Sequence, residues 1–302
     1  MATAAETLDS TPDLGSGAPS RSIATRIASR LGQGTVQIIL IVIAVFWLVP
    51  VFGLLISSLR PDTANSASGW WTVFTAPSQL TLENYTNLLG ESAITTSLIN
   101  TVLISVPATV LVVLIGALAA YALAWIEFPG RAWVMIGVVG LLVVPIQIAL
   151  IPIAKLYGAT NLFGTIPGVV LFHVAFGLPF AVFLLRNYFS GIPRDLLEAA
   201  RMDGASEWSI FRRVVLPIGL PAIASLAIFQ FLWVWNDLLV ALVFADPDSA
   251  PITIALRGQL RQFGSNIDIL ASGSFISIVI PLLVFFSFQR YFVQGVLAGS
   301  TK

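Results

Sequence analysis

Six long apolar stretches dominate this chain, and they constrain its fold more than any other feature. They lie at about residues 36–58, 97–126, 132–154, 165–185, 218–244 and 272–288. Most exceed the ~20 residues that a helix needs to cross a roughly 30 Å hydrocarbon core, whereas the strands of a membrane barrel would alternate over about ten residues. The sequence therefore predicts an all-α membrane protein with six transmembrane helices.

The composition supports this class and excludes several others. Hydrophobic residues make up 57% of the 302 residues and charged residues only 10%, against about 25% charged in soluble domains. The formal net charge is zero, so no charge excess attracts nucleic acid, and no nucleic-acid partner is expected. Cysteine is absent, which excludes disulfides, thiolate metal sites and cysteine nucleophiles.

The distribution of basic residues predicts the orientation in the membrane. Residues 1–34 are rich in Ala, Ser, Thr and Gly and are expected to form a disordered cytoplasmic tail, with the transmembrane domain over residues 35–302. If both termini are cytoplasmic, only four of the fifteen Lys and Arg residues face the outside, namely Arg60, Lys155, Arg257 and Arg261. The other eleven lie inside, as the positive-inside rule requires.

A polar loop at residues 187–217 joins the fourth and fifth stretches on the inner side. Pro193 favours a helix start and Gly204 a helix end, so a helix of about three turns is predicted from Pro193 to Asp203. Ser206 is expected to cap a second amphipathic segment. From periodicity alone, the loop is as consistent with an ordinary helix lying on the membrane surface as with a functional element.

Polar residues inside the spans are the candidates for a translocation path. An intramembrane carboxylate such as Asp237 costs roughly 2.5–3.5 kcal/mol on insertion scales, so it normally faces a bundle interior or a wet cavity. Two interpretations stay open for it: a place near a solute path, or a structural partner on a neighbouring helix or at the outer interface. His173 is interpreted as a hydrogen-bonded packing residue rather than a site residue. The path candidates are Gln147, Gln230, Trp235, Asn236 and Asp237.

Catalytic and nucleotide-binding motifs are missing from the sequence. There is no GxxxxGK[ST] phosphate loop, so any ATP must be handled by a different chain. There is no HExxH or GxSxG motif either. The chain is therefore expected to have no catalytic residues, no metal site and no enzymatic activity of its own.

The inner loop resembles a known family motif. The sequence EAARMDGAS at residues 198–206, followed by Phe211 and by Leu216-Pro217, resembles the EAA loop of ATP-binding-cassette (ABC) importer permeases. Residues 145–155, 184–193 and 289–299 resemble the smaller permease subunit of maltose-type carbohydrate importers, and the resemblance covers about residues 35–300. One departure is Trp125, where the family usually has a basic residue.

The resemblance implies a type I importer permease fold in a prokaryotic inner or plasma membrane. In such importers a second permease subunit pairs with this one, and an ATPase dimer that carries ATP and Mg docks below. An extracytoplasmic binding protein delivers the di- or oligosaccharide, and this chain binds no cofactor. The EAA loop forms a cytoplasmic coupling helix, whose expected ATPase-contacting residues here are Glu198, Ala199, Ala200, Asp203, Gly204 and Ala205.

Three alternatives stay open at the level of the sequence. The solute could be a polyol or glycerol phosphate instead of a sugar. The chain could be an ATP-independent secondary transporter, although such transporters usually need more buried ionisable groups than Asp237 and His173. It could also be a membrane scaffold with no pore.

Overall fold

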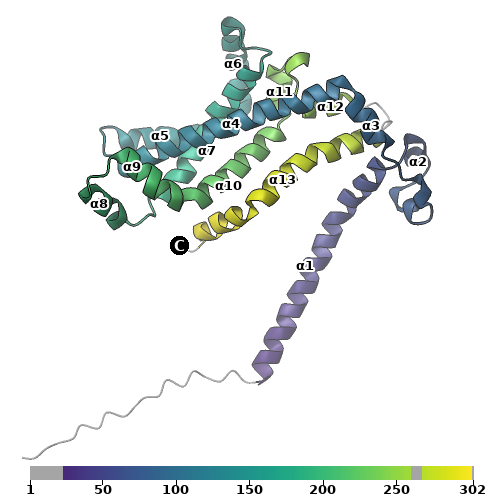
Figure 1. Ribbon diagram of the computed structural model, residues 1–302, viewed down its shortest axis with the longest axis horizontal. Coiled ribbons are helices and arrows are strands. Elements are labelled where there is room, and N and C mark those ends of the chain that lie inside the picture. Colours follow the sequence, from purple (N-terminus) through teal and green to yellow (C-terminus); the bar gives the residue numbers. More distant parts are fainter. Residues whose placement is uncertain (1–22, 260–266, 301–302) are drawn as a thin grey trace, which may run out of the picture. The chain divides into compact units, whose positions relative to one another are not determined.

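The computed structural model describes residues 23–259 and 267–300, and every named element in this described part is a helix (Figure 1). Five described helices are long and apolar enough to cross a membrane. A sixth span is possible if the bent pair α5–α6 counts as one. The long helices are α1 (Ile23–Ser58), α4 (Ser92–Trp125), α5 (Arg131–Leu142), α6 (Ile146–Thr160), α7 (Ile166–Phe189), α10 (Leu216–Trp235) and α13 (Ile267–Ser300).

Short helices connect these spans. The loop at residues 187–217, predicted to carry the coupling helix and called the coupling loop below, contains α8 (Arg194–Met202), α9 (Glu207–Ile210) and the π turn η3 (Phe211–Val215). The other short elements are α2 (Asp62–Ala67), η1 (Trp70–Phe74), η2 (Pro77–Gln79), α3 (Glu83–Gly90), α11 (Leu239–Phe244), η4 (Pro247–Ser249) and α12 (Ile252–Gln259). The prediction of an all-α membrane protein is therefore confirmed.

Several boundaries differ from the sequence prediction, among them those of the N-terminal tail and of the third apolar stretch. The helix α1 begins at Ile23, so the tail expected over residues 1–34 is helical from residue 23 on, while residues 1–22 lie outside the described part. The stretch at 132–154 is not one helix but two, α5 and α6, bent by 100° at a short break. Pro145 explains the break, because its ring removes a backbone N–H and biases Val144 away from helical geometry. The chain divides into two units at Gly53, within α1.

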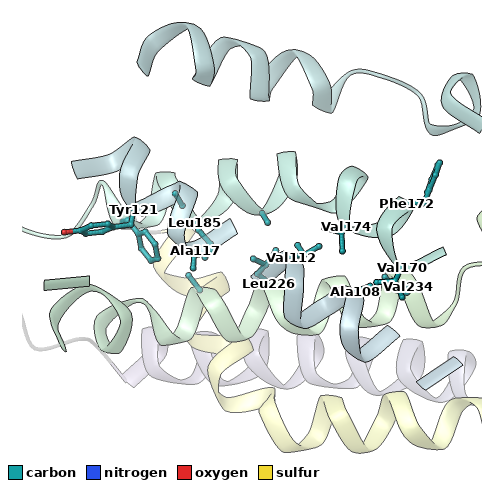
Figure 2. Packing of buried hydrophobic residues seen from close by; sticks show 14 of the residues in the cluster. Ala108, Val112, Ala117, Tyr121, Val170, Phe172, Val174, Leu185, Leu226 and Val234 are labelled. Carbon is teal, nitrogen blue, oxygen red and sulfur yellow. The ribbon is translucent and has the colours of Figure 1, made fainter. Parts of the chain in front are cut away.

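The core of the larger unit lies where α4, α7 and α10 pack together (Figure 2). α4 and α7 form the most extensive helix pair in this unit. Small residues allow their close approach: a Cβ added to Gly116 would lie 2.9 Å from the Cβ of Ala181. The buried residues labelled in the figure are Ala108, Val112, Ala117, Tyr121, Val170, Phe172, Val174, Leu185, Leu226 and Val234.

Gly116→Leu is expected to destabilise the protein by about 1–3 kcal/mol, because the new side chain must push α4 and α7 apart. Gly137→Leu on α5 is the matched control, since a Cβ there meets nothing within 4 Å. Thermal unfolding of the purified variants in detergent measures the difference. Equal unfolding temperatures for the two variants would contradict the close packing of α4 on α7.

A buried arginine organises the segment after α1. Arg60, which the orientation rule placed on the outer side, is 0% exposed. Its guanidinium donates hydrogen bonds to the carbonyl of Ala64 (2.8 Å), to Ser68 Oγ (2.8 Å), to Thr72 Oγ1 (3.1 Å) and to Gln79 Oε1 (3.2 Å). This one side chain therefore holds α2, η1 and η2 together, because a buried cation is tolerated only with its donors satisfied.

Candidate functional site

The predicted coupling helix is present as α8, and its ends form as its residues dictate. Pro193 is its N-cap, and Asp203 is its C-cap. Gly204 follows with φ +79°, a left-handed conformation that only glycine adopts without strain. Ser206 then caps α9, because its hydroxyl accepts a hydrogen bond from the Ser209 N–H at 3.4 Å. The predicted helix, turn and second cap are thus confirmed.

One side of α8 packs on the bundle, and the other is open. Leu197 is 0% exposed and belongs to the main core, and Ala200 is half-buried against that core. Of the six residues expected to contact an ATPase, Ala200 and Ala205 therefore face partly inward. Glu198, Ala199, Asp203 and Gly204 are exposed. Sequence reasoning missed Met202, which is 84% exposed beside them.

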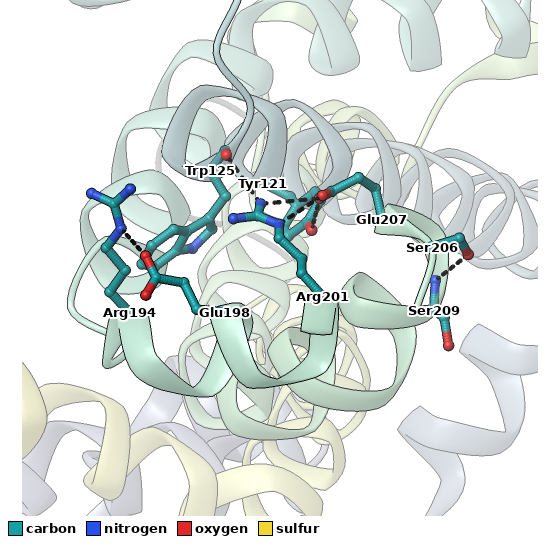
Figure 3. Close-up of polar contacts among 8 residues, drawn as sticks. All are labelled: Tyr121, Trp125, Arg194, Glu198, Arg201, Ser206, Glu207 and Ser209. Atoms are coloured by element: carbon teal, nitrogen blue, oxygen red, sulfur yellow. Dashed lines mark hydrogen bonds and ion pairs between the residues drawn. The ribbon is translucent and has the colours of Figure 1, made fainter. Parts of the chain in front are cut away.

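Glu198 forms an ion pair within its own helix. Its Oε1 accepts a hydrogen bond from Arg194 Nε at 2.8 Å (Figure 3). Both side chains are well exposed, and such surface pairs contribute only about 0–1 kcal/mol. The carboxylate of Glu198 can therefore exchange this partner for a cation on another protein at little cost to the fold.

A group of four residues, here called the clamp, fixes the coupling loop to the end of α4: Tyr121, Trp125, Arg201 and Glu207. The Tyr121 hydroxyl donates to Glu207 Oε2 at 2.5 Å, and Arg201 Nε donates to Glu207 Oε1 at 2.9 Å (Figure 3). The bond to Glu207 raises the pKa of Arg201, a residue that is charged at physiological pH without this shift. Because Arg201 is on α8, Glu207 on α9 and Tyr121 on α4, the clamp joins all three elements.

Trp125 extends the clamp to α7. Its indole Nε1 donates to the carbonyl of Phe189 at 3.1 Å, and its own carbonyl accepts from Arg201 Nη2 at 3.5 Å. The carbonyl of Ala124 accepts from Arg131 Nη2 at 3.0 Å. Two arginines from elsewhere in the chain thus reach the negative end of α4. They place positive charge beside Trp125, at the end of α4.

Asp237 is a helix cap rather than an isolated intramembrane charge. It interrupts the stretch expected as one helix over 218–244, because α10 ends at Trp235 and α11 begins at Leu239. Its carboxylate accepts from the N–H groups of Val240 (3.3 Å) and Ala241 (3.1 Å) at the start of α11. These bonds are local to the chain, and the role of Asp237 in a solute path stays a prediction.

His173 approaches the same carboxylate without forming a hydrogen bond to it. Its Nε2 lies 3.7 Å from Asp237 Oδ2 and the ring is 1% exposed. Its Nδ1 has no hydrogen-bond partner in the described part of the chain. The ring meets Trp233 edge to face, with centroids 5.6 Å apart. The ring of His173 packs among its neighbours, and the hydrogen bond expected for it is not found among the described residues.

The other path candidates lie in different environments. Gln230 is 3% exposed and its Nε2 lacks a partner among the described residues, while Trp235 is 1% exposed and donates to the Ser277 carbonyl of α13 at 2.9 Å. Asn236 and Gln147 are exposed, the first bonding back to the Leu232 carbonyl and the second on α6. The hydrogen bonds described above for Trp235, Asn236 and Asp237 therefore do not join the path candidates to one another. Their partners are Ser277, Leu232, Val240 and Ala241. No group of three or more metal-binding side chains is found within the described segments.

Comparison with known proteins now assigns the family. Residues 97–298 match the model of the binding-protein-dependent transport system inner membrane component. The chain belongs to this family. The permease is 50% identical over 272 residues to an osmoprotective compounds uptake permease protein of Synechocystis, covering 88% of this chain and 91% of the relative. It is 52% identical over 235 residues to an alpha-glucoside transport system permease protein of Rhizobium meliloti, covering 76% of this chain but only 62% of that relative.

A solved structure supports the permease fold. The permease matches a chain of a bacterial ABC transporter involved in the import of the acidic polysaccharide alginate, with a TM-score of 0.74 and 22% identity. The match covers 91% of the permease and 100% of that chain. At this identity the likeness shows the fold alone. The permease fold predicted from the sequence is therefore confirmed.

Proposed function

We propose that this permease pairs with a second permease to form the translocation path of an ATP-driven sugar importer, and that α8 is the element through which an ATPase drives it. The observation that carries the proposal is the combination of an exposed α8 surface with the clamp behind it. A surface helix transmits a rigid-body movement only when it is firmly joined to its spans. Tyr121, Arg201 and Glu207 provide that junction to α4.

The same proposal assigns the partners and the orientation. Both termini lie in the cytoplasm of a prokaryotic cell, and an ATPase dimer with its ATP and Mg docks on Glu198, Ala199, Asp203 and Gly204. An extracytoplasmic binding protein delivers the solute on the other side. The permease itself binds no cofactor and catalyses no reaction. Closure of the ATPase dimer moves α8 and rotates the bundle between inward-open and outward-open states.

The solute class rests on the names of relatives. An alpha-glucoside permease is 52% identical and an arabinooligosaccharide permease of Halalkalibacterium halodurans is 37% identical over 262 residues. Both names favour a di- or oligosaccharide. The relative that is 50% identical is named for osmoprotective compounds, and this name does not specify a sugar. Sugar import is the main proposal and the polyol is the second candidate.

Uptake into proteoliposomes tests the function. Vesicles that contain the permease, its second permease and the ATPase should accumulate labelled maltose or trehalose only with ATP inside and the binding protein outside. A labelled polyol in the same assay distinguishes the second candidate. Uptake by the permease alone, without ATP, would show a secondary transporter instead. No uptake of any solute by the complete complex would favour a scaffold.

A further inference from the structure

A groove between α5 and α7 has an unusual lining. Four residues of α5 form its apolar wall, Ala132, Met135, Ile136 and Val139, and the remaining lining residue is Arg186 of α7. The two helices pack against each other along this region (Figure 1). The α5 wall spans about two helical turns, roughly 10 Å at 1.5 Å per residue. The groove is therefore long enough for part of an acyl chain and has a single cationic group.

Arg186 has no acidic partner among the described residues. Its Nε is buried yet has no hydrogen-bond partner in the described part of the chain. Its Nη1 reaches only the amide oxygen of the adjacent Asn187, at 3.4 Å. None of the ion pairs found among the described residues includes it. A guanidinium presents five donors, and a buried donor that stays unsatisfied costs about 1–3 kcal/mol, so this site is incomplete as it stands.

The groove lies at the ends of α5 and α7, where a membrane interface is expected. Arg186 is in the last turn of α7, a few residues before α8, and Ala132 is in the first turn of α5. Trp133, the next residue on α5, is 76% exposed, as expected for an aromatic side chain at the boundary between lipid and water. The groove therefore opens near the membrane surface on the same side as the coupling helix.

We propose that this groove binds one anionic phospholipid, with its phosphate on Arg186 and an acyl chain along Met135, Ile136 and Val139. Arginine binds phosphate oxygens in a bidentate manner, and the apolar wall replaces the lipid surroundings of the chain. Basic pockets between transmembrane helices on the cytoplasmic side are suited to such head groups. The site is independent of the solute, and its lipid would stiffen the α7 end from which the coupling loop begins.

Native mass spectrometry of the full permease, purified in detergent with the subunits that accompany it, tests the proposal. Phosphatidylglycerol and phosphatidylcholine with identical acyl chains are the two lipid probes. We expect phosphatidylglycerol to bind more tightly, and Arg186→Gln to weaken its binding by at least about fivefold. Ala132→Phe, which fills the groove and leaves the charge, should weaken it as well. The affinity of Arg186→Lys for phosphatidylglycerol should lie between those of the wild type and Arg186→Gln. Lysine keeps the positive charge but cannot bind the phosphate in a bidentate manner.

A matched charge removal distinguishes binding in this groove from general attraction between anionic lipid and a basic surface. Lys155→Gln removes the same charge from an exposed position on α6 and should leave phosphatidylglycerol binding unchanged. The proposal would be overturned if Lys155→Gln and Arg186→Gln lost the same amount of phosphatidylglycerol binding. It would also be overturned if Arg186→Gln bound phosphatidylglycerol as tightly as the wild type. Displacement of the lipid by glycerol 3-phosphate alone would show a site for soluble phosphates instead. A cross-link from a cysteine at Val139 to the second permease would show that protein, and not lipid, fills the groove.

Discussion

Glu198→Lys is expected to reduce ATP-dependent uptake by at least about 30-fold while the permease stays folded. The carboxylate lies on the exposed side of α8, where the proposed ATPase surface begins, and residues at the centre of protein interfaces are worth about 2 kcal/mol or more. The fold changes little, because the lost partner, Arg194, forms only an exposed pair within the same helix. The measurement is uptake into proteoliposomes, with co-purification of the ATPase as a second readout.

The matched control for this charge reversal is Glu127→Lys. Glu127 is exposed in the turn before α5, on the same side of the membrane, and it belongs to no ion pair found among the described residues. The Glu127→Lys variant should show ATP-dependent uptake close to that of the wild type. Wild-type uptake and wild-type co-purification in Glu198→Lys would show that α8 does not dock on the ATPase.

Glu207→Ala is expected to reduce uptake by about tenfold without preventing assembly of the complex. Removing this carboxylate leaves the Tyr121 hydroxyl and the Arg201 guanidinium without their acceptor, although partial exposure of the pair limits the loss. The coupling loop then moves relative to α4, and ATP hydrolysis no longer drives the bundle efficiently. The amount of ATP hydrolysed per solute transported should rise, which a purely structural defect would not cause.

Two further variants identify the clamp as the cause. Glu207→Gln keeps one acceptor oxygen and loses the other, and Tyr121 and Arg201 Nε donate to different oxygens, so one of the two bonds is retained. The uptake of Glu207→Gln should therefore lie between that of Glu207→Ala and that of the wild type. Tyr121→Phe removes one of the same bonds, and its effect should be non-additive with that of Glu207→Ala, as for residues of one network. Additive effects, or an unchanged ratio of ATP to solute in Glu207→Ala, would exclude a role of the clamp in coupling.

The coupling helix could be predicted from the sequence because its signals are local. Pro193, Gly204 and Ser206 act on backbone groups within a few residues of themselves, so their effects do not depend on the rest of the fold. That the chain spans a membrane was predictable for a similar reason, since the length and composition of the apolar stretches reflect the bilayer. Residues that face outward on α8 were harder to assign, because the side on which Leu197 is buried depends on the bundle.

The clamp could not be predicted, because its contacts join distant parts of the chain. Tyr121 and Glu207 are 86 positions apart, and neither residue type is unusual near a membrane boundary. A lone tyrosine in the alanine-rich end of the second stretch was the only signal in the sequence. The path candidates were harder to predict for another reason. A polar side chain within an apolar stretch can face a cavity or bond to a neighbouring helix, and Trp235 bonds to the Ser277 carbonyl.

A single cysteine placed at Ala199 provides the most direct test of the central proposal, that an ATPase drives this permease through α8. The natural chain has no cysteine, so every thiol cross-link reports this one exposed position. We expect a cross-link between this position and the ATPase in the assembled transporter, and a loss of ATP-dependent uptake once the link has formed. Modification of the same cysteine by a membrane-impermeant reagent from outside the cell would contradict the proposal.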